Sequence, residues 1–296
     1  MSGEGSVTGR SAVSRRRRVL GVLIVVLVIA LAWVLIKFLA GDPWRIDGQL
    51  VHNPPFRWKL ANDQSLPHIW QVFGTMTRPI QPGGPALASL LFDFSVYTAR
   101  GAALGFALGA GFGLSLGILL AHVRVLERAL VPYVVMSQTV PIIAIAPVIV
   151  IGLQAGWFSV AIVASYLTFF PVTIGTLRGL RSADPRAIEL MRSLAAGRRE
   201  VLWKLRLPAS APYLFTAFKI SATAAVVGAI VGELPAGVRD GLGGALLSFN
   251  QYYTIAPERL WAALIFSAGL GIVAFMLVVA AERLFLRGYR QTEELT

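Results

Sequence analysis

The sequence predicts an all-α integral membrane protein with six transmembrane helices and both termini in the cytoplasm. Of its 296 residues, 56% are hydrophobic and only 14% are charged, whereas a soluble domain carries about 25% charged residues. The apolar residues also gather in runs long enough to cross about 30 Å of hydrocarbon as helices. The Lys and Arg residues fall mostly in alternate gaps between these runs, as the positive-inside bias requires.

The chain is expected to begin with a disordered, basic cytoplasmic tail over residues 1–18, which is rich in Ser and Gly and ends in four arginines. Residues 19–40 form the first predicted span, and Lys37 near its end is expected to reach out to the membrane interface. A cleavable signal peptide is the alternative. Its apolar core is normally about 7–15 residues long and is followed by a small-residue cleavage site, neither of which fits here. A retained span is therefore favoured.

Residues 41–86 predict an extracytoplasmic loop, because seven prolines and three tryptophans lie among polar residues. Tryptophan suits a segment that rests on the membrane interface. The role of this tryptophan-rich loop stays open.

Residues 87–286 form a predicted core of five further spans, and residues 287–296 form a cytoplasmic tail. The second span carries a glycine at every fourth position from Gly101 to Gly117, so the glycines share one helix face. Small residues at this spacing let helix backbones approach closely, and we expect packing within the chain rather than a dimer contact. The five predicted spans are 87–121, 128–153, 156–178, 211–234 and 258–286.

The distribution of charge excludes several classes of protein. The formal net charge of +12 does not indicate nucleic-acid binding, because the basic residues follow the membrane topology. Cysteine is absent and the three histidines are far apart, which argues against a metal cluster. A membrane enzyme would need clustered acids within the spans, and the acids in these spans are isolated. A stand-alone ion-coupled carrier, the alternative of another class, needs ion-binding acids and an inverted repeat, and neither is seen.

The largest predicted cytoplasmic feature is the loop 179–211. Asp184 followed by Pro185 predicts a helix start, and Gly197 predicts its end. A second short helical segment is expected to lead to Pro208. The resulting helix, turn and helix would present an apolar ridge flanked by arginines, which suits docking into a groove on a partner. The ridge residues are Ile188, Met191, Leu194 and Ala195.

This loop resembles the "EAA" loop of ABC-transporter permeases of the binding-protein-dependent import type. The resemblance is carried by Glu189, by a small residue at Ala195 and by Leu207–Pro208 at the family's spacing. The sequence departs from the pattern at Leu190 and Met191, where the family has two alanines, and at Ala195, where it has glycine.

Other stretches resemble the nitrate/sulfonate/taurine branch of these permeases. They include PIIAIAPVIVIGLQAGWFS at 141–159, FFPVTIGTLRGLRSADP at 169–185 and VGELPAGVRDGLGGAL at 231–246. The resemblance covers about residues 90–285 and leaves residues 1–86 outside. Two stretches, VVGAIVGELP and QTVPIIAIAPV, are also similar to the offshoot that handles pyrimidine precursors and riboflavin-like compounds.

The resemblance implies a type I importer permease that is not itself an enzyme. The chain has no G-x-x-x-x-G-K-[ST] phosphate loop, so ATP and Mg²⁺ would be bound by a partner subunit, and this chain would hold no cofactor or metal. The implied partners are two ATP-binding cassette subunits, an extracytoplasmic substrate-binding protein and a second permease copy or paralogue, in the plasma membrane of a prokaryote. The residues implied in ATPase coupling are Glu189, Leu190, Met191, Leu194, Ala195, Gly197 and Pro208.

The third predicted span is interrupted by Pro132, Pro141 and Pro147, which free backbone carbonyls that are tolerated only against protein or a water-filled path. Polar residues near this break are candidates for a solute path, although their hydroxyls could instead bond their own helices. A buried acid at Glu233 would serve as a gate, a ligand or a structural element, paired with Arg239 or Arg100. The path candidates are Gln138, Thr139, Tyr166, Thr168, Thr223 and Glu233.

The middle of the second to sixth spans contains no Lys or Arg. A site for a naked anion would be expected to hold a cation or a helix N-terminus. The sequence therefore favours a neutral aromatic heterocycle, such as a pyrimidine precursor or a riboflavin-like compound, over sulfonate, taurine or nitrate-type anions. Whether the permease pair is a homodimer or a heterodimer stays open.

Overall fold

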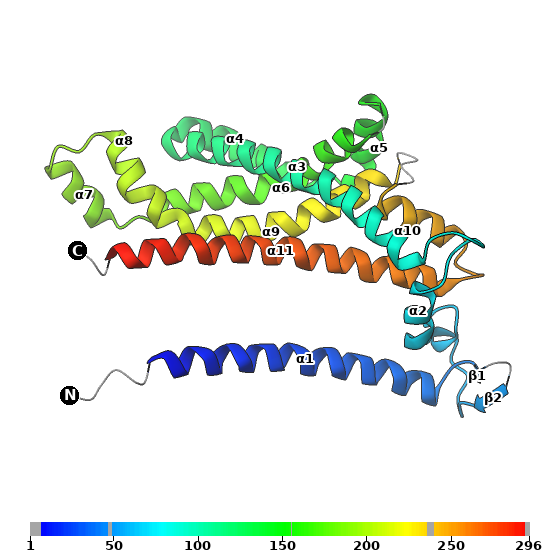
Figure 1. Ribbon diagram of the computed structural model, residues 1–296. Coiled ribbons are helices and arrows are strands. Elements are labelled where there is room, and N and C mark those ends of the chain that lie inside the picture. The colour runs from blue at the N-terminus through cyan, green and yellow to red at the C-terminus, as the bar shows by residue number, and fades with distance from the viewer. Residues whose placement is uncertain (1–6, 47–48, 155, 236–239, 294–296) are drawn as a thin grey trace, which may run out of the picture.

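The structure is a computed structural model that describes residues 7–46, 49–154, 156–235 and 240–293. The described chain is helical except for one β-hairpin, and the start of α1 and the end of α11 lie at the same end of the molecule as α7 (Figure 1). The hairpin and α2 lie at the opposite end. The elements are α1 Val7–Leu39, β1 Trp44–Ile46, β2 Gln49–His52, α2 Ile69–Met76, α3 Leu87–His122, α4 Arg124–Met136, α5 Ile142–Gly152, α6 Trp157–Arg181, α7 Pro185–Ser193, α8 Arg198–Val201, α9 Leu207–Glu233, α10 Leu242–Gln251 and α11 Pro257–Glu293.

Four of the described helices are long and apolar enough to cross a membrane. A fifth unit consists of two helices, 124–139 and 142–152, bent by 94°. The apolar part of α1, Ile24–Leu39, is shorter than these helices, so the sixth span stays a prediction. The four helices run over 87–122, 157–181, 198–233 and 257–286.

The break in the predicted third span lies at Pro141. This residue has extended backbone angles and directly precedes α5, whereas Pro132 and Pro147 lie inside α4 and α5. Proline lacks the N–H that would continue the helix, and its ring crowds the preceding turn. One of the three prolines thus makes the bend, and the other two are accommodated within their helices.

The core is built from α3, α6 and α9, with α6 between the other two. The glycines of α3 face α6, as the sequence predicts: a Cβ added to Gly105 or Gly109 would lie 2.6 Å from a backbone carbonyl oxygen of α6. On the opposite side, a Cβ added to Gly228 of α9 would lie 2.7 Å from the Cα of Ala164. The expected packing within the chain is confirmed for this glycine face.

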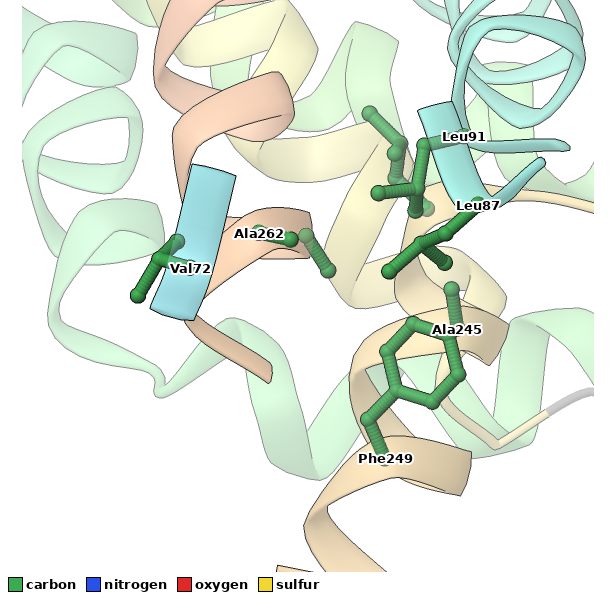
Figure 2. Packing of buried hydrophobic residues seen from close by; sticks show 8 residues of the cluster. Val72, Leu87, Leu91, Ala245, Phe249 and Ala262 are labelled. Carbon is green, nitrogen blue, oxygen red and sulfur yellow. The ribbon is translucent and has the colours of Figure 1, made fainter. Parts of the chain in front are cut away.

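A second cluster joins α2, α3, α10 and α11 at the hairpin end of the molecule. Leu87 and Leu91 of α3 are fully buried against Ala245 and Phe249 of α10, and Val72 of α2 lies beside Ala262 of α11 (Figure 2). Apolar burial at this junction fixes α2 to the long helices.

Residues 41–86 form a folded module rather than a simple loop. The strands β1 and β2 pair antiparallel, α2 follows, and Trp33 of α1 donates a hydrogen bond to the Pro67 carbonyl at 3.1 Å. The same Trp33 packs edge-to-face on Trp261 of α11, with ring centroids 4.7 Å apart. The hairpin module, residues 40–86, thereby links the end of α1 to α11, although α1 otherwise lies apart from the core (Figure 1).

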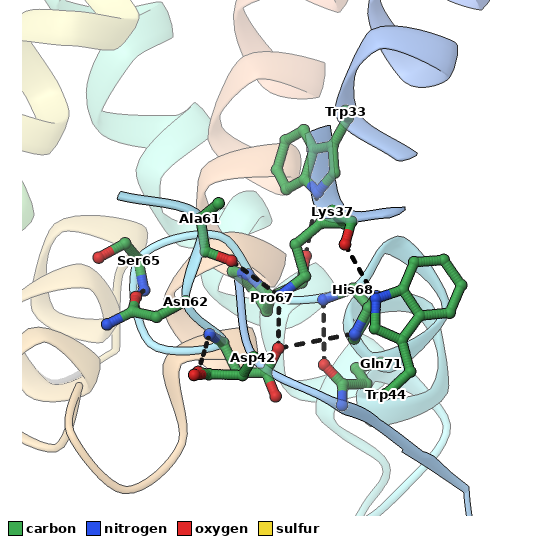
Figure 3. A network of polar contacts seen from close by, with 11 residues as sticks. Trp33, Lys37, Asp42, Trp44, Ala61, Asn62, Ser65, Pro67, His68 and Gln71 are labelled. Carbon is green, nitrogen blue, oxygen red and sulfur yellow. Dashed lines mark hydrogen bonds and ion pairs between the residues drawn. The ribbon is translucent and has the colours of Figure 1, made fainter. Parts of the chain in front are cut away.

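Lys37 is buried, with 1% of its side chain exposed, so the prediction that it reaches the membrane interface is wrong. Its ammonium group donates to the Ala61 carbonyl at 3.1 Å and pairs with Asp63 (Figure 3). A buried ammonium is tolerated only where partners of this kind replace its water. The sequence could not show this, because both partners belong to the module that folds back over the helix end.

His68 stacks on Trp70 beside this ion pair, with ring centroids 4.1 Å apart. Burial, aided by the positive charge of Lys37 and opposed by Asp63, lowers the pKa of His68 to about 4. An unfolded histidine titrates near 6.5, so the neutral ring contributes its full stability above that pH. The contribution is lost as the pH falls from about 6.5 towards about 4.

The predicted disordered tail differs from the structure over residues 7–18, which continue α1 as helix. Arginine is a good helix former, so the basic run can extend the helix beyond its apolar part. Residues 1–6 lie outside the described residues. At the other end, α11 continues to Glu293 through most of the predicted C-terminal tail.

We predict opposite effects of one added methyl group at two glycines of α3. Gly105→Ala places a Cβ 2.6 Å from the Ala161 carbonyl oxygen, so α3 and α6 must separate at a cost of about 1–3 kcal/mol. Gly111→Ala meets nothing within 4 Å and should stabilise the helix by about 0.5–1 kcal/mol. Thermal unfolding of the full chain in detergent measures both. Shifts of the same sign would contradict the packing argument.

Candidate coupling loop and solute path

The helix α7 begins as the sequence predicts. The Asp184 carboxylate accepts a hydrogen bond from the backbone N–H of Arg186 at 2.9 Å, and Pro185 occupies the first turn. The cap satisfies one of the N–H groups that a helix start leaves without a partner, and proline needs none there.

The helix α7 ends at Ser193, and its terminating residue is Ala195, two residues before the predicted terminator Gly197. Ala195 has a positive φ of 59°, and the N–H groups of Ala195 and Ala196 donate to the carbonyls of Arg192 and Met191, both at 3.0 Å. This pair of bonds closes the helix in the way that usually calls for glycine. Gly197 is extended and instead precedes α8. Ala195 thus occupies the position where the resembling family has its glycine.

The expected second short helix is in fact the start of a long one. Helical backbone runs without interruption from Arg198 to Glu233, through a π-helical turn at Leu202–Arg206. In this turn the N–H of Leu207 donates to the carbonyl of Leu202, five residues back. The wider turn precedes Pro208, which lies at the start of α9 and needs no N–H partner there. The helix that contains the fifth predicted span therefore begins 13 residues before residue 211, where the prediction starts the span.

The two sides of α7 differ in exposure. Leu190 and Leu194, four residues apart on one face, are 62% and 73% exposed. Ile188 and Met191 are half-buried against the rest of the loop, and Glu189 is exposed. Leu194 of the predicted apolar ridge is therefore exposed, whereas Ile188 and Met191 are not. Leu190, which the predicted ridge did not include, is exposed on the same face as Leu194.

The loop that carries α7 is fixed at both ends. The Ser182 hydroxyl lies within hydrogen-bond distance of the Gly179 carbonyl of α6, at 2.8 Å, and of the Ala209 carbonyl of α9, at 3.3 Å. A bidentate ion pair between Arg181 and Glu127 also joins the end of α6 to α4. The segment that leads into α7 is therefore tied to α4 and to α9 at its start.

Three of the path candidates come together at the bend between α4 and α5. Gln138 and Thr139 are exposed there, and the Tyr166 hydroxyl of α6 donates to the Ser137 carbonyl. Thr139 bonds the Met136 carbonyl of its own turn at 2.8 Å. The bend is thus tied to α6 by an aromatic side chain.

Two other candidates lie away from this bend. Thr168 of α6 is fully buried against Gly109 of α3. Its hydroxyl donates to the Ala164 carbonyl at 2.9 Å. Thr223 is half-buried on α9 and donates to the Ile220 carbonyl at 2.8 Å. Both hydroxyls bond their own helix, as the structural alternative expects.

Glu233 is fully buried and holds three helices together. One carboxylate oxygen accepts hydrogen bonds from the Thr98 hydroxyl of α3 at 3.0 Å and from the Gly243 N–H of α10 at 2.7 Å. Thr98 also accepts from the Leu242 N–H at 2.9 Å. Within the described ranges Glu233 has no basic partner at ion-pair distance, and Arg239 lies outside them.

Sequence reasoning missed the partners of Glu233. A Cβ added to Gly243 would lie 2.7 Å from the Glu233 Cβ, and one added to Gly241 would overlap the carboxylate. The signal available was the pair of glycines that follows a buried acid within the same stretch, because only glycine lets a helix start approach a carboxylate so closely.

Comparison with known proteins identifies the family of this helical chain. Residues 113–287 match the family described as "Binding-protein-dependent transport system inner membrane component". The formylaminopyrimidine transport permease protein ThiX of Halalkalibacterium halodurans is 32% identical over 67% of this chain and 78% of its own length. The riboflavin transport system permease protein RibX of Chloroflexus aurantiacus is 36% identical over 68% and 75%. The putative aliphatic sulfonates transport permease protein SsuC of Bacillus subtilis is 29% identical over 74% and 83%.

The helical spans and the rigid loop between α6 and α9 define a membrane-embedded transport subunit. The chain belongs to the binding-protein-dependent family of ABC importer permeases, in the branch that includes sulfonate and pyrimidine permeases.

We predict that Ala195→Gly stabilises the end of α7. An alanine in the left-handed region costs about 1–2 kcal/mol, and glycine adopts that conformation without the penalty. Hydrogen exchange of the α7 amides should slow by roughly tenfold, because about 1.4 kcal/mol corresponds to a factor of ten in local opening. Ala196→Gly is the matched control, since Ala196 lacks a positive φ and should gain nothing. Equal slowing in both variants would contradict the conformational argument.

Proposed function

We propose that this chain is the permease of an ATP-driven importer whose α7 docks on a separate ATP-binding subunit. The observation that carries the proposal is the exposed pair Leu190 and Leu194 on a helix fixed to both α6 and α9. Apolar side chains at i and i+4 on a protruding helix are typical anchors for a groove on a partner. Two permease chains, two ATP-binding subunits and an extracytoplasmic binding protein would make up the importer.

The proposed orientation places α7 and both termini in the cytoplasm. The arginines around α7 support this side through the positive-inside bias, and the described ends of α1 and α11 lie at the same end of the molecule (Figure 1). The hairpin module then faces outward. With α1 as the first span and the bent pair as the third, the proposed count is six spans.

Closure of the ATP-binding subunits would drive the two copies of α7 together. Because α7 is joined to α6 and to the long helix 198–233 by short segments, and Ser182 bonds to α9, these helices would move together with it. The bend at Pro141, tied to α6 through Tyr166, would move with them. This movement would switch access to a solute path between the two sides of the membrane.

The proposed solute is a neutral aromatic heterocycle, such as a pyrimidine precursor or a riboflavin-like compound. ThiX and RibX, whose names state such solutes, support this class. Lys219 near the start of the fifth span does not offer a free cation, because it pairs with Glu282 of α11 at 2.6 Å. An organic sulfonate, named for SsuC, is the alternative solute.

The docking proposal is tested by cross-linking, for which the absence of cysteine is an advantage. Leu190→Cys or Leu194→Cys should cross-link to the co-purified ATP-binding subunit, and the link should change yield when ATP is added. Ile255→Cys, which is 80% exposed at the opposite end of the molecule, is the control and should give none. Transport by the purified chain alone, or equal cross-linking from all three positions, would overturn the proposal.

A second test measures whether α7 couples ATP hydrolysis to uptake. Glu189→Lys reverses a charge on an exposed position of α7, so the spans should remain folded while ATP hydrolysis no longer drives uptake. Uptake into proteoliposomes should fall by at least about tenfold, as for the loss of one central contact in an interface. Unchanged thermal unfolding confirms that the spans are intact.

The proposed solute class is tested on the co-purified binding protein. Aromatic heterocycles should raise its unfolding temperature, and alkyl sulfonates should not.

A further inference from the structure

A groove of about 1410 Å³ lies between α7, the junction of α3 with α4, and the start of the long helix 198–233. We name it the arginine groove, because six arginines line it against two glutamates. These arginines come from four separate helical segments, so the fold, rather than one run of sequence, gathers them. They are Arg124, Arg128, Arg181, Arg192, Arg198 and Arg206.

Most of this positive charge has no counterpart within the protein. Arg181 is neutralised by Glu127. The other five arginines form no ion pair with any residue that the structure describes. Glu189 is the second acid of the groove. Like charges held this close repel one another unless an anion lies between them.

Arg206 gives the clearest indication of a missing partner. Its Nε atom is buried and has no hydrogen-bond partner among the described residues. A buried N–H of a charged group that lacks an acceptor is costly, and native structures rarely leave one. Arg206 lines the groove, so an acceptor bound there would satisfy the Nε atom after a shift of the side chain that exposes it.

His122 and several apolar side chains complete the walls of the groove, and the apolar ones include Val131, Leu180, Ile188 and Val201. Leu180 lies at the end of α6 and Val201 near the start of the long helix 198–233, while Val131 belongs to α4 and Ile188 to α7. An occupant with an anionic head and an apolar body would match both kinds of wall. Basic pockets between spanning helices bind lipid head groups.

We propose that the arginine groove binds a phosphate group, supplied either by the head group of an anionic phospholipid or by free phosphate. Guanidinium groups bind phosphate oxygens through two parallel hydrogen bonds, and several converging arginines select phosphate over a carboxylate ion of single charge. The site goes beyond the transport function. It lies on the inner side of α7, whereas Leu190 and Leu194 face away from the rest of the chain.

The test uses the full chain in detergent, with and without its co-purified ATP-binding subunit. Phosphatidylglycerol, phosphatidylcholine and inorganic phosphate are added separately, and binding is measured by native mass spectrometry and by thermal unfolding. The test variant is Arg192→Gln/Arg198→Gln/Arg206→Gln. The matched control is Arg178→Gln/Arg186→Gln/Arg199→Gln, which removes the same charge from exposed positions that do not line the groove.

Phosphatidylglycerol or inorganic phosphate should bind and raise the unfolding temperature, while phosphatidylcholine should not. The groove variant should weaken that binding by on the order of tenfold or more, and the control variant should not. Binding of phosphatidylglycerol alone identifies the lipid as the source, and binding of inorganic phosphate identifies the free ion. Arg192→Gln/Arg198→Gln, which changes exposed side chains only, replaces the triple variant if the latter does not fold.

Three results would overturn the proposal. Equal loss of binding in the groove and control variants would show general attraction to a basic surface. Loss of the bound phosphate group when the ATP-binding subunit assembles would show that the groove belongs to the protein interface. Absence of binding by all three probes would also overturn it, because the groove would then hold no phosphate group.

Discussion

The close approach of α3, α6 and α9 is the constraint on which the rest of the structure depends. Lipid tails are as apolar as the side chains, so no hydrophobic driving force brings helices together in a membrane. The helices associate instead through close approach of their backbones and van der Waals contact. Gly105 and Gly109 bring α3 onto the carbonyls of α6, and Gly228 brings α9 onto Ala164 from the other side. Because no side chain separates these backbones, the three helices cannot slide independently and behave as one body.

The loop that carries α7 connects two helices of this three-helix body, α6 and α9. Asp184 fixes where α7 starts, the turn at Ala195 fixes where it ends, and the Ser182 hydroxyl lies between the carbonyls of α6 and α9. The π-helical turn at Leu202–Arg206 lets the chain enter α9 without a break, despite Pro208. Under the proposed docking, a force applied to α7 would reach the core helices through the short segments that join it to α6 and to the long helix 198–233.

Local signals were predictable from the sequence, and features that depend on distant partners were not. The cap at Asp184 and the glycine face of α3 each follow from a short pattern with one physical meaning. The sequence left Glu233 open as a gate, a ligand or a structural element, and it did not predict the partners of Glu233 or Lys37, because these lie far away in the sequence. The end of α7 was misplaced since glycine is only a preference, and the hydrogen bonds of the turn impose a positive φ on Ala195 instead.

The arginines illustrate why topology and site can share the same residues. The positive-inside bias would account for a cytoplasmic position of these arginines, but it does not explain why side chains from α4, α6, α7 and the start of the long helix 198–233 converge on one groove. If their only role were orientation, each could point into water, and Arg206 would have no reason to bury its Nε atom. Convergence and burial both have a cost that an anion in the groove removes. The same charges can therefore orient the chain during insertion and hold the inner side of α7 in the folded protein, leaving its outer side for a partner.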